Sequence, residues 1–319
     1  MMGKIDALCI GKKKGQRKHP VASVIFRADH GIEGDAHASP GHRQVSLLSS
    51  EDIETARRSG LPDIGPGDFA ENVVISGIDL APLGLGSRLR LGPDVVLTVT
   101  QIGKVCHAPC RIAKLTGDCI MPRLGLFTRV QTPGKGSVGD KVEIIETINR
   151  DVFQAVVLTV SDRCSQGLRQ DTAGPAVVKC LKETLNAHIY RTEILPDEKP
   201  IIIDRLKHYS DGHSIDLVVT VGGTGFAPRD VTPEASREVI ERFTPGLDEA
   251  MRAASLSKTP HAMLSRGTSG IVGSTLIVNL PGSERAASEN LETILPALSH
   301  GLLKLRGDTT DCTPPPPPQ

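Results

Sequence analysis

The stretch VVTVGGTGFAPRDVTPEA, which runs from Val218 to Ala235, decides the fold of the second half of the chain. Its apolar start predicts a buried strand, and its end predicts a helix with Thr232 as the N-cap and Pro233 at the first helical position. Three glycines, an arginine and Asp230 lie between the two elements. Packing alone requires neither this backbone freedom nor these charges at the end of a buried strand, so the pattern indicates a binding site.

Strand and helix alternate on both sides of this stretch. Apolar strands are predicted at FQAVVLTVSD and STLIVNLPG, and helices at VVKCLKETL, DEKPIIIDRLKHY and SERAASENLETILPALSHGLLKL. Such alternation favours parallel strands joined by crossover helices. We therefore expect an α/β three-layer domain with a mostly parallel sheet and helices on both of its faces.

Three strand ends in this half are rich in glycine and polar residues, at 159–163, 221–230 and 279–284. Ligands of open parallel sheets bind beyond the carboxyl ends of the strands. Free backbone N–H groups and the N-terminus of the next helix suit a phosphate. The loop residues that would provide this cradle are Gly222, Gly223, Thr224 and Gly225.

The carboxylate of Asp230 would repel a phosphate bound beside it. A divalent cation between the two removes this conflict, and Mg²⁺ is typically held by one or two carboxylates together with substrate phosphates. In the alternative interpretation, Asp230 is a helix cap or turn residue and the glycines form a tight turn.

Seven motifs of this half occur in a characteristic order: TVSD, DTAGP, LPDE, GGTGFAPRDVTPEA, PGLDEAMR, LSRG and STLIVNLPG. Together they closely resemble the MogA/MoaB family of molybdenum-cofactor biosynthesis. The resemblance implies Mg²⁺-dependent transfer of AMP from ATP to the terminal phosphate of molybdopterin, with release of pyrophosphate. It also implies a homotrimer formed through this domain. Some members of the family have the fold without evident activity, so a non-catalytic carrier or storage protein for the cofactor is the alternative.

The same resemblance assigns roles to residues of this chain. It implies that Asp197 and Asp230 are catalytic and hold Mg²⁺ and the reacting phosphates, although a helix-capping role would also explain Asp197. It implies a larger set of residues that bind the pterin or the nucleotide: Gly222, Gly223, Thr224, Gly225, Arg229, Thr232, Asp162, Asp171, Gly174, Ser265, Asn279, Pro281 and Gly282.

The first half has a different pattern of predicted elements. Short strands are predicted at KIDALCIG, ASVIFRA, RQVSLLS, ENVVISG, SRLRLG, DVVLTVTQIG and DKVEIIE, with glycine and proline turn signals between them. One helix is expected at SSEDIETARRSG, with Ser49 or Ser50 as its cap and Gly60 as its stop. This pattern predicts a mostly β sandwich or barrel. The basic run from Lys12 to Lys18 is expected to be a solvated loop.

The motifs GIEGDAHA, GDFAENV, GKVCH and GDCIMPR resemble the MOSC domain, a β-barrel in which a cysteine carries sulfur or ligates molybdenum. The resemblance implies a domain that binds, sulfurates or transfers the molybdenum cofactor. Its candidate catalytic thiols are Cys106, Cys110 and Cys119, of which Cys110 is the candidate molybdenum ligand, and the choice among the three stays open.

Other residues of this half bear on that site. Lys104, His107 and Arg111 would lower the pKa of a nearby thiol, whereas Cys9 is expected in the core of a strand. Asp35, His37, His42 and Arg43 are candidates for a pocket that takes an anionic pterin, and their alternative role is that of turn and loop polar residues.

Length and composition indicate the number of domains and the classes of protein that can be excluded. The 319 residues suggest two domains, for which we expect the bounds 4–147 and 152–307, followed by a disordered proline-rich tail at 308–319. Lys and Arg number 37, as do Asp and Glu, so the basic excess of a nucleic-acid binder is missing. No apolar run reaches the ~18 residues of a membrane span, and we expect a cytoplasmic protein. Since both resemblances indicate one pathway, its molybdenum-insertion and molybdoenzyme-maturation proteins are candidate partners.

Overall fold

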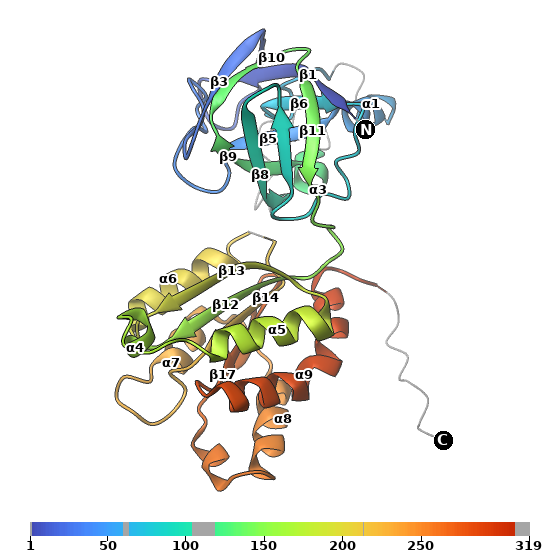
Figure 1. Ribbon diagram of the computed structural model, residues 1–319. Helices are drawn as coiled ribbons and strands as arrows, with labels where there is room; N and C mark the ends of the chain where they lie inside the picture. The colour runs from blue at the N-terminus through green and yellow to red at the C-terminus, as the bar shows by residue number, and fades with distance from the viewer. Residues whose placement is uncertain (1, 60–63, 104–118, 213, 310–319) are drawn as a thin grey trace. The chain divides into compact units, whose positions relative to one another are not determined.

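The structure is a computed structural model that describes residues 2–59, 64–103, 119–212 and 214–309 (Figure 1). The chain divides into two compact units, Met1–Val152 and Phe153–Gln319, and each is described by itself. Within the described ranges, none of the helices is both long enough and apolar enough to cross a membrane. The predicted tail lies outside the described residues from position 310 onward.

Seven strands of the first unit close into a barrel, which confirms the predicted fold class. Their order is β11-β7-β8-β9-β5-β6-β1, and β1 pairs back onto β11 to close the ring. The strands are β1 (Gly3–Ile10), β5 (Val45–Ser49), β6 (Val73–Ser76), β7 (Arg88–Leu91), β8 (Val95–Ile102), β9 (Leu126–Thr132) and β11 (Lys141–Glu146). The barrel closes because alternate apolar side chains of these strands point inward, among them Ile5, Leu47 and Leu97, which are fully buried.

Smaller elements complete this unit. Strand β2 (His19–Val21) pairs with the end of β1, and a separate sheet has the order β10-β3-β4, formed by Gly134–Ser137, Ser23–Arg27 and Gly31–Ile32. Helix α1 (Ser50–Arg58) follows β5, and the short helix α3 spans Met121–Leu124. The Ser49 hydroxyl accepts a hydrogen bond from the Asp52 amide at 2.9 Å, so Ser49 is the cap of α1. The predicted stop, Gly60, lies outside the described residues.

The second unit is a six-stranded, mostly parallel sheet covered by helices, as predicted. The strand order is β13-β12-β14-β17-β16-β15. The parallel strands are β12 (Gln154–Val160), β13 (His188–Leu195), β14 (Leu217–Val221) and β17 (Thr275–Leu280); β16 (Ser269–Val272) and β15 (Arg242–Phe243) add an antiparallel edge.

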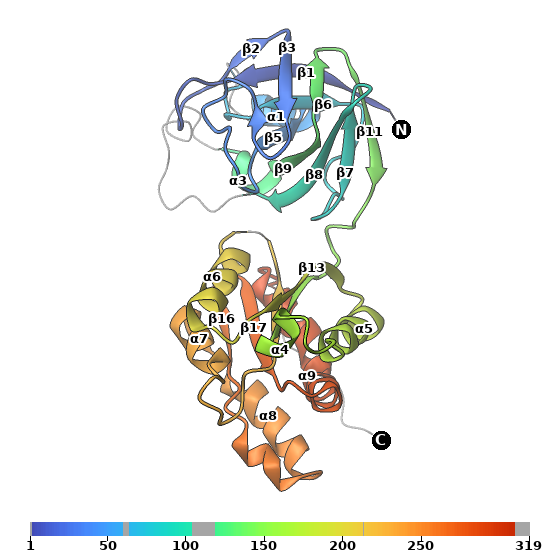
Figure 2. The ribbon, with the colours of Figure 1, turned by 60° about the vertical axis from the view of Figure 1, so that its left-hand side comes forward.

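Helices cover both faces of this sheet (Figure 2). Helices α5 (Ala173–Leu185) and α9 (Glu284–Leu305) pack against each other on one face, and α8 (Pro245–Leu256) packs against α9. Helices α6 (Lys199–Ser210) and α7 (Thr232–Val239) pack together on the other face. The short elements are α4 (Asp162–Ser165) and the 3-10 helix η1 (Pro260–Leu264).

The core of the second unit holds the parallel strands in place. Side chains of β12, β14 and β17 join those of α5 and α9 in one apolar cluster that includes Val157, Val219, Val278, Leu181 and Leu291, all at most 1 % exposed. Burial of each such side chain contributes ~1.5–3 kcal/mol. Because β12, β13, β14 and β17 are parallel, the loops that follow them converge at one edge of a rigid sheet.

Candidate active site

Two neighbouring cavities open at this edge of the sheet. The smaller cavity, of about 300 Å³, is lined by Asp171, Asp197, Gly222 and other residues that follow β12, β13 and β14. The larger cavity, of about 510 Å³, is lined by Thr224, Gly225, Ser265 and Pro281, among others. Four residues line both cavities, namely Gly223, Asp230, Gly282 and Ser283. Two separate ligands could therefore meet at this shared wall.

The glycine loop needs its glycines for close approach. Gly222 and Gly223 have φ angles of +108° and +63°, a region that side chains rarely adopt. A Cβ on Gly222 would lie 2.3 Å from the Val160 carbonyl oxygen, and one on Gly223 would lie 2.3 Å from the Thr232 hydroxyl. The Gly222 amide donates to the Leu280 carbonyl at 3.0 Å. Gly222 and Gly223 are thus pressed against β12, β17 and α7 with no room for a side chain.

Asp162 and Asp197 are joined by two reciprocal hydrogen bonds. The Asp162 amide donates to the Asp197 carboxylate at 2.7 Å, and the Asp197 amide donates to the Asp162 carboxylate at 3.0 Å. Arg229 donates two further hydrogen bonds to the Asp162 carboxylate, at 2.8 and 3.0 Å. The loops after β12, β13 and β14 are therefore connected through a single carboxylate.

The two aspartates differ in their pKa values. The hydrogen bonds from Arg229, and then the one from the Asp197 amide, lower the pKa of Asp162. Burial raises the pKa of Asp197, and the negative charges of Asp162 and Asp230 raise it further, while the hydrogen bond from the Asp162 amide opposes them. Asp197 is thus a carboxylate that a bound cation would stabilise.

Asp230 lies in a turn and on the wall of both cavities. Its carboxylate accepts a hydrogen bond from the Ala227 amide at 2.9 Å, and its own amide donates to the Ala227 carbonyl at 2.9 Å. A Cβ on Gly225 would lie 2.9 Å from this carboxylate. Asp230 is thus a turn residue, as the alternative interpretation has it, and its side chain also faces the cavities.

Thr232 is not the cap of α7, so this prediction was wrong. The cap position is taken by Val231, whose side chain makes no cap hydrogen bond. The Thr232 amide donates instead to the Gly223 carbonyl at 3.1 Å, which draws the threonine side chain toward Gly223. The hydroxyl is buried, without a hydrogen-bond partner among the described residues.

Asp171 ties the first strand of the sheet to helix α5. Its carboxylate accepts hydrogen bonds from the Thr159 hydroxyl at 2.7 Å and from the Gly174 amide at 2.9 Å. A Cβ on Gly174 would lie 2.4 Å from one Asp171 carboxylate oxygen. Gly174 therefore allows Asp171 to reach the wall of the smaller cavity, which Gly174 itself does not line.

Asn279 connects strands and helix from inside the core. It is 2 % exposed, and its side-chain amide donates to the hydroxyls of Thr220 and Ser236, both at 2.8 Å. It lines neither of the two cavities. The structure thus places it behind the site, where it fixes β14, β17 and α7, while Ser265 and Pro281 lie on the wall of the larger cavity.

The acidic side chains fit a magnesium ion that is shared with a substrate. Among the residues that the structure describes, no cluster of three or more His, Cys, Asp or Glu side chains could hold a metal ion by itself. Asp197 and Asp230 do line the same smaller cavity. Two carboxylates that face one cavity are the usual protein contribution to a Mg²⁺ ion whose other ligands are phosphate oxygens and water.

The first unit has a cavity of about 410 Å³ with basic side chains on its wall, here called the basic cavity. Its charged or titratable lining residues are Lys14, Lys18, His37, His42 and Arg43. No acidic side chain is found among its described lining residues, so the field in the cavity favours an anion.

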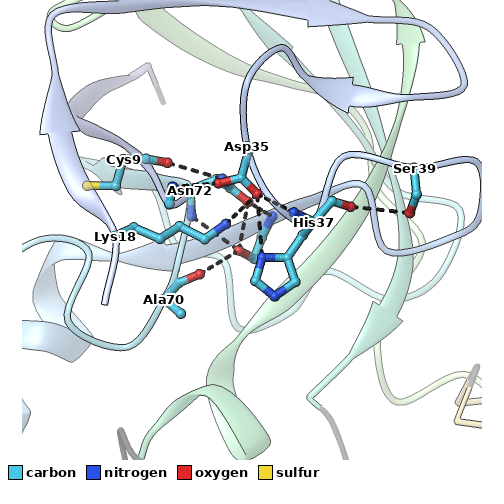
Figure 3. Close-up of polar contacts among 9 residues, drawn as sticks. Cys9, Lys18, Asp35, His37, Ser39, Ala70 and Asn72 are labelled. Atoms are coloured by element: carbon cyan, nitrogen blue, oxygen red, sulfur yellow. Dashed lines mark hydrogen bonds and ion pairs between the residues drawn. The ribbon is translucent and has the colours of Figure 1, made fainter. Parts of the chain in front are cut away.

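Lys18, which lines this cavity, forms a buried ion pair with Asp35 (Figure 3). The Lys18 ammonium lies 3.0 Å from the Asp35 carboxylate, and the two side chains are 2 % and 1 % exposed. The Asp35 carboxylate also accepts hydrogen bonds from the amides of Gly11 and His37, both at 2.9 Å. Burial alone would raise the pKa of Asp35, but the hydrogen bonds and the Lys18 charge together lower it. Lys18 is therefore a core residue, and the prediction of a solvated loop was wrong at this position.

The candidate thiols of this unit are only partly covered by the structure. Cys106 and Cys110 lie outside the described residues, as do Lys104, His107 and Arg111. Cys119 is 9 % exposed and belongs to the same apolar cluster as Cys9 and Met121. Cys9 is fully buried, as predicted, and burial followed by the Glu71 charge raises the pKa of its thiol to about 12.

Sequence reasoning missed two charged residues. Lys18 stands at the end of a basic run, and nothing in the pattern separates it from the exposed lysines before it. Arg266 belongs to the LSRG motif, of which only Ser265 was assigned a role. Its backbone and guanidinium donate four hydrogen bonds to the glycine loop, the Asp230 main chain and α7.

Family models match both halves of the chain. A model described as a probable molybdopterin binding domain matches residues 156–300, and one for the MOSC domain matches residues 33–143. The molybdopterin adenylyltransferase of Helicobacter pylori strain J99 is 43 % identical over 145 residues, which cover 45 % of this chain and 82 % of that protein. The chain belongs to the molybdopterin-binding domain family.

This member of the molybdopterin-binding domain family carries a MOSC domain in its first half. The molybdenum cofactor synthesis protein cinnamon of Drosophila melanogaster is 44 % identical over 154 residues, which cover 48 % of this chain but only 26 % of cinnamon. The crystal structure of the molybdopterin biosynthesis enzyme MoaB from Thermus thermophilus is 47 % identical. It matches 49 % of this chain and 98 % of MoaB, with a TM-score of 0.47.

Proposed function

We propose that this protein acts in molybdenum-cofactor biosynthesis and that its second unit is a molybdopterin adenylyltransferase. The observation that carries this proposal is the pair of cavities that share Gly223, Asp230, Gly282 and Ser283. A reaction between two phosphorylated substrates needs two adjoining binding sites and a group at their boundary. The 43 % identity to an adenylyltransferase, over most of that protein, supports the same reaction.

In the proposed reaction, an oxygen of the terminal phosphate of molybdopterin attacks the α-phosphorus of ATP. A new P–O bond forms, the bond between the α-phosphorus and the bridging oxygen breaks, and pyrophosphate leaves with both electrons of that bond. Such transfers depend mainly on positioning and on neutralisation of charge. The amides of the glycine loop would hold phosphate oxygens, and Asp230 would stand at the point where the two substrates meet.

Asp197 and Asp230 would hold Mg²⁺ together with phosphate oxygens of ATP. When bound, the ion would neutralise charge on the phosphates that react. Asp162 and Asp171 form hydrogen bonds with other residues of the protein. Asp162 joins Asp197 to Arg229, and Asp171 joins Thr159 to Gly174. We infer that both aspartates keep the shape of the smaller cavity, and that Arg229 can turn from Asp162 toward a phosphate.

For the first unit we propose that the basic cavity takes the phosphate end of the pterin. Lys14, His37, His42 and Arg43 support an anionic ligand, whereas the charge of Lys18 is balanced by its ion pair with Asp35. A cysteine at Cys106, Cys110 or Cys119 would carry sulfur or ligate molybdenum, and the burial of Cys119 favours the first two. The cofactor would then pass to proteins of molybdenum insertion and molybdoenzyme maturation. We further propose a homotrimer formed through the second unit.

Pyrophosphate release tests the adenylyltransferase proposal. Purified protein is incubated with molybdopterin, ATP and Mg²⁺, pyrophosphate is measured with a coupled assay, and the adenylylated pterin is identified by mass spectrometry. We expect equal amounts of the two products and none when Mg²⁺ is chelated. Binding of molybdopterin without any release of pyrophosphate would reject the enzyme and favour a carrier or storage protein for the cofactor.

A further inference from the structure

Arg266 connects several parts of the site without lining either cavity. It lies between η1 and β16, and its side chain is 30 % exposed. Its amide donates to the Thr224 carbonyl at 2.9 Å, and its guanidinium donates to the Gly225 carbonyl at 2.7 Å and to the Asp230 carbonyl at 2.5 Å. A third guanidinium nitrogen bonds the Glu234 carboxylate in the first turn of α7. One side chain thus holds both ends of the segment 225–230.

The other contacts of this segment do not fix its position in the same way. The hydrogen bonds between Ala227 and Asp230 lie within the segment, so they set its own shape but not its place relative to the sheet. Arg229 anchors it to Asp162 through two hydrogen bonds, but the Arg229 side chain is 58 % exposed, so solvent screens this pair. The less exposed guanidinium of Arg266, bonded to two main-chain carbonyls and one carboxylate, is the stronger restraint.

We propose that Arg266 is a positioning residue that keeps the Asp230 carboxylate at the wall shared by the two cavities. The expected effect on kcat rests on the proposed adenylyl transfer, whereas the hydrogen bonds of Arg266 to segment 225–230 do not depend on that reaction. Arg266 acts through the main chain of Asp230 and touches neither substrate. Loss of its bonds would let segment 225–230 shift while the rest of both cavities kept its shape. A misplacement of about 1 Å can lower a rate by ~10²-fold.

The test compares Arg266→Met, Arg266→Lys and the control Arg205→Met. Methionine keeps much of the volume but has no donor, and lysine keeps the charge but not the planar fork. Arg205 forms an ion pair with Asp204 on α6, away from both cavities. We expect kcat to fall by about 10- to 100-fold in Arg266→Met, by less in Arg266→Lys, and not in Arg205→Met. The KM values for ATP and molybdopterin should stay within about 3-fold of wild type.

Rescue separates positioning from a general loss of stability. Free guanidinium ion at low millimolar concentration should restore part of kcat in Arg266→Met, because it can occupy the vacated space and bond the same carbonyls. It should restore nothing in Asp230→Asn, where the carboxylate itself is missing. A rise in KM and a loss of thermal stability without a fall in kcat, or full activity of Arg266→Met, overturns the proposal. If Arg266→Met does not fold, the kcat of Arg266→Lys decides.

Amide hydrogen exchange provides a readout that needs no turnover. Peptides that cover residues 222–232 should exchange faster in Arg266→Met than in wild type, whereas peptides of α5 and α9 should not change. If wild-type protein makes no pyrophosphate, the proposed function fails and the exchange result alone decides the role of Arg266. Unchanged exchange in residues 222–232 would show that Arg266 does not hold this segment.

Discussion

The main-chain amides of Asp162 and Asp197 each donate a hydrogen bond to the carboxylate of the other residue, at 2.7 and 3.0 Å. The two residues are separated by 35 positions in the chain, and the bonds join the end of β12 to the end of β13. This exchange brings two negative charges together, and of the two residues only Asp197 lines the smaller cavity. Asp162 is stabilised by Arg229, whereas the pKa of Asp197 is raised by burial and by its neighbours. The first two predictions follow from this difference.

Asp197→Asn should reduce turnover without reducing stability. Because the folded state raises the pKa of Asp197, this group stabilises the fold fully below its unfolded pKa and loses that contribution as pH rises through its folded pKa. At neutral pH the charged carboxylate therefore opposes folding, and asparagine removes that charge. We expect kcat to fall by about 100-fold and the Tm to equal or exceed that of wild type. A lower Tm with unchanged kcat would assign Asp197 a structural role only.

Asp162→Asn should move the acid limb of the pH–rate profile to lower pH. The charge of Asp162 is one of the causes that raise the pKa of Asp197, and Arg229, freed from Asp162, opposes that rise. Both effects lower the pKa of Asp197 in the variant. The measurement is kcat/KM from about pH 4 to 8. Asp211→Asn, at an exposed position after α6, is the control and should leave the profile in place.

Asp230→Ala should abolish adenylyl transfer and leave the fold intact. The Asp230 carboxylate lines both cavities, and the hydrogen bond that it accepts from Ala227 lies within an exposed turn. We expect loss of pyrophosphate release to background, with a circular dichroism spectrum like that of wild type. Asp211→Ala serves as the control for loss of an exposed carboxylate. Full activity of Asp230→Ala would refute the assignment of the site.

Gly223→Ala should damage both the stability and the activity of the second unit. Alanine at this position would have to adopt a φ of +63°. Its methyl group would lie 2.3 Å from the Thr232 hydroxyl and 3.1 Å from the Asp197 carboxylate. Strain of this kind costs ~1–3 kcal/mol. Gly246→Ala is the matched control, because no atom lies within 4 Å of the added methyl group and helix α8 favours alanine. Equal Tm values for the two variants would contradict this account of the loop.

Lys18→Met should destabilise the first unit strongly. It leaves the Asp35 carboxylate buried without its cation, and loss of one partner of a buried ion pair costs ~3–5 kcal/mol. Lys18→Met combined with Asp35→Asn should recover much of this free energy of unfolding. Both tyrosines, Tyr190 and Tyr209, belong to the second unit, and the chain has no tryptophan. Tyrosine fluorescence should therefore keep its midpoint in urea, while circular dichroism shows an earlier transition.

Elements with a long apolar run or a strong apolar period could be predicted from the sequence. Strands β12, β14 and β17 are buried throughout, and helix α9 was predicted although Pro296 lies inside it. Strand β13, HIYRTEIL, was missed because it is the outer strand of the sheet, where only Leu195 is buried and polar residues are tolerated. Helix α8 contains the family motif PGLDEAMR but was not predicted as a helix. Strands β15 and β16 were not predicted because they are short.

Site residues could be predicted where glycines and charged residues follow a strand. Contacts between residues that are distant in the sequence could not be predicted. Asp230 and the glycine loop stand out because packing does not require them at a strand end. The contact of Asp162 with Asp197, and those of Arg266 with Gly225 and Asp230, depend on loop conformations that no sequence period encodes. At Thr232 the residue type led to a wrong prediction. Threonine suits a cap position, but the Thr232 amide donates to the Gly223 carbonyl and Val231 takes the cap position.

The wall shared by the two cavities also limits how this site can diverge. A substitution at Gly223, Asp230, Gly282 or Ser283 alters the boundary of both binding sites at once. Selectivity for a different nucleotide or a different pterin must therefore arise at residues that line only one cavity, such as Gln170 in the smaller or His261 in the larger. Variation among relatives of this protein should concentrate at these outer positions, and the common boundary should be the slowest part of the site to change.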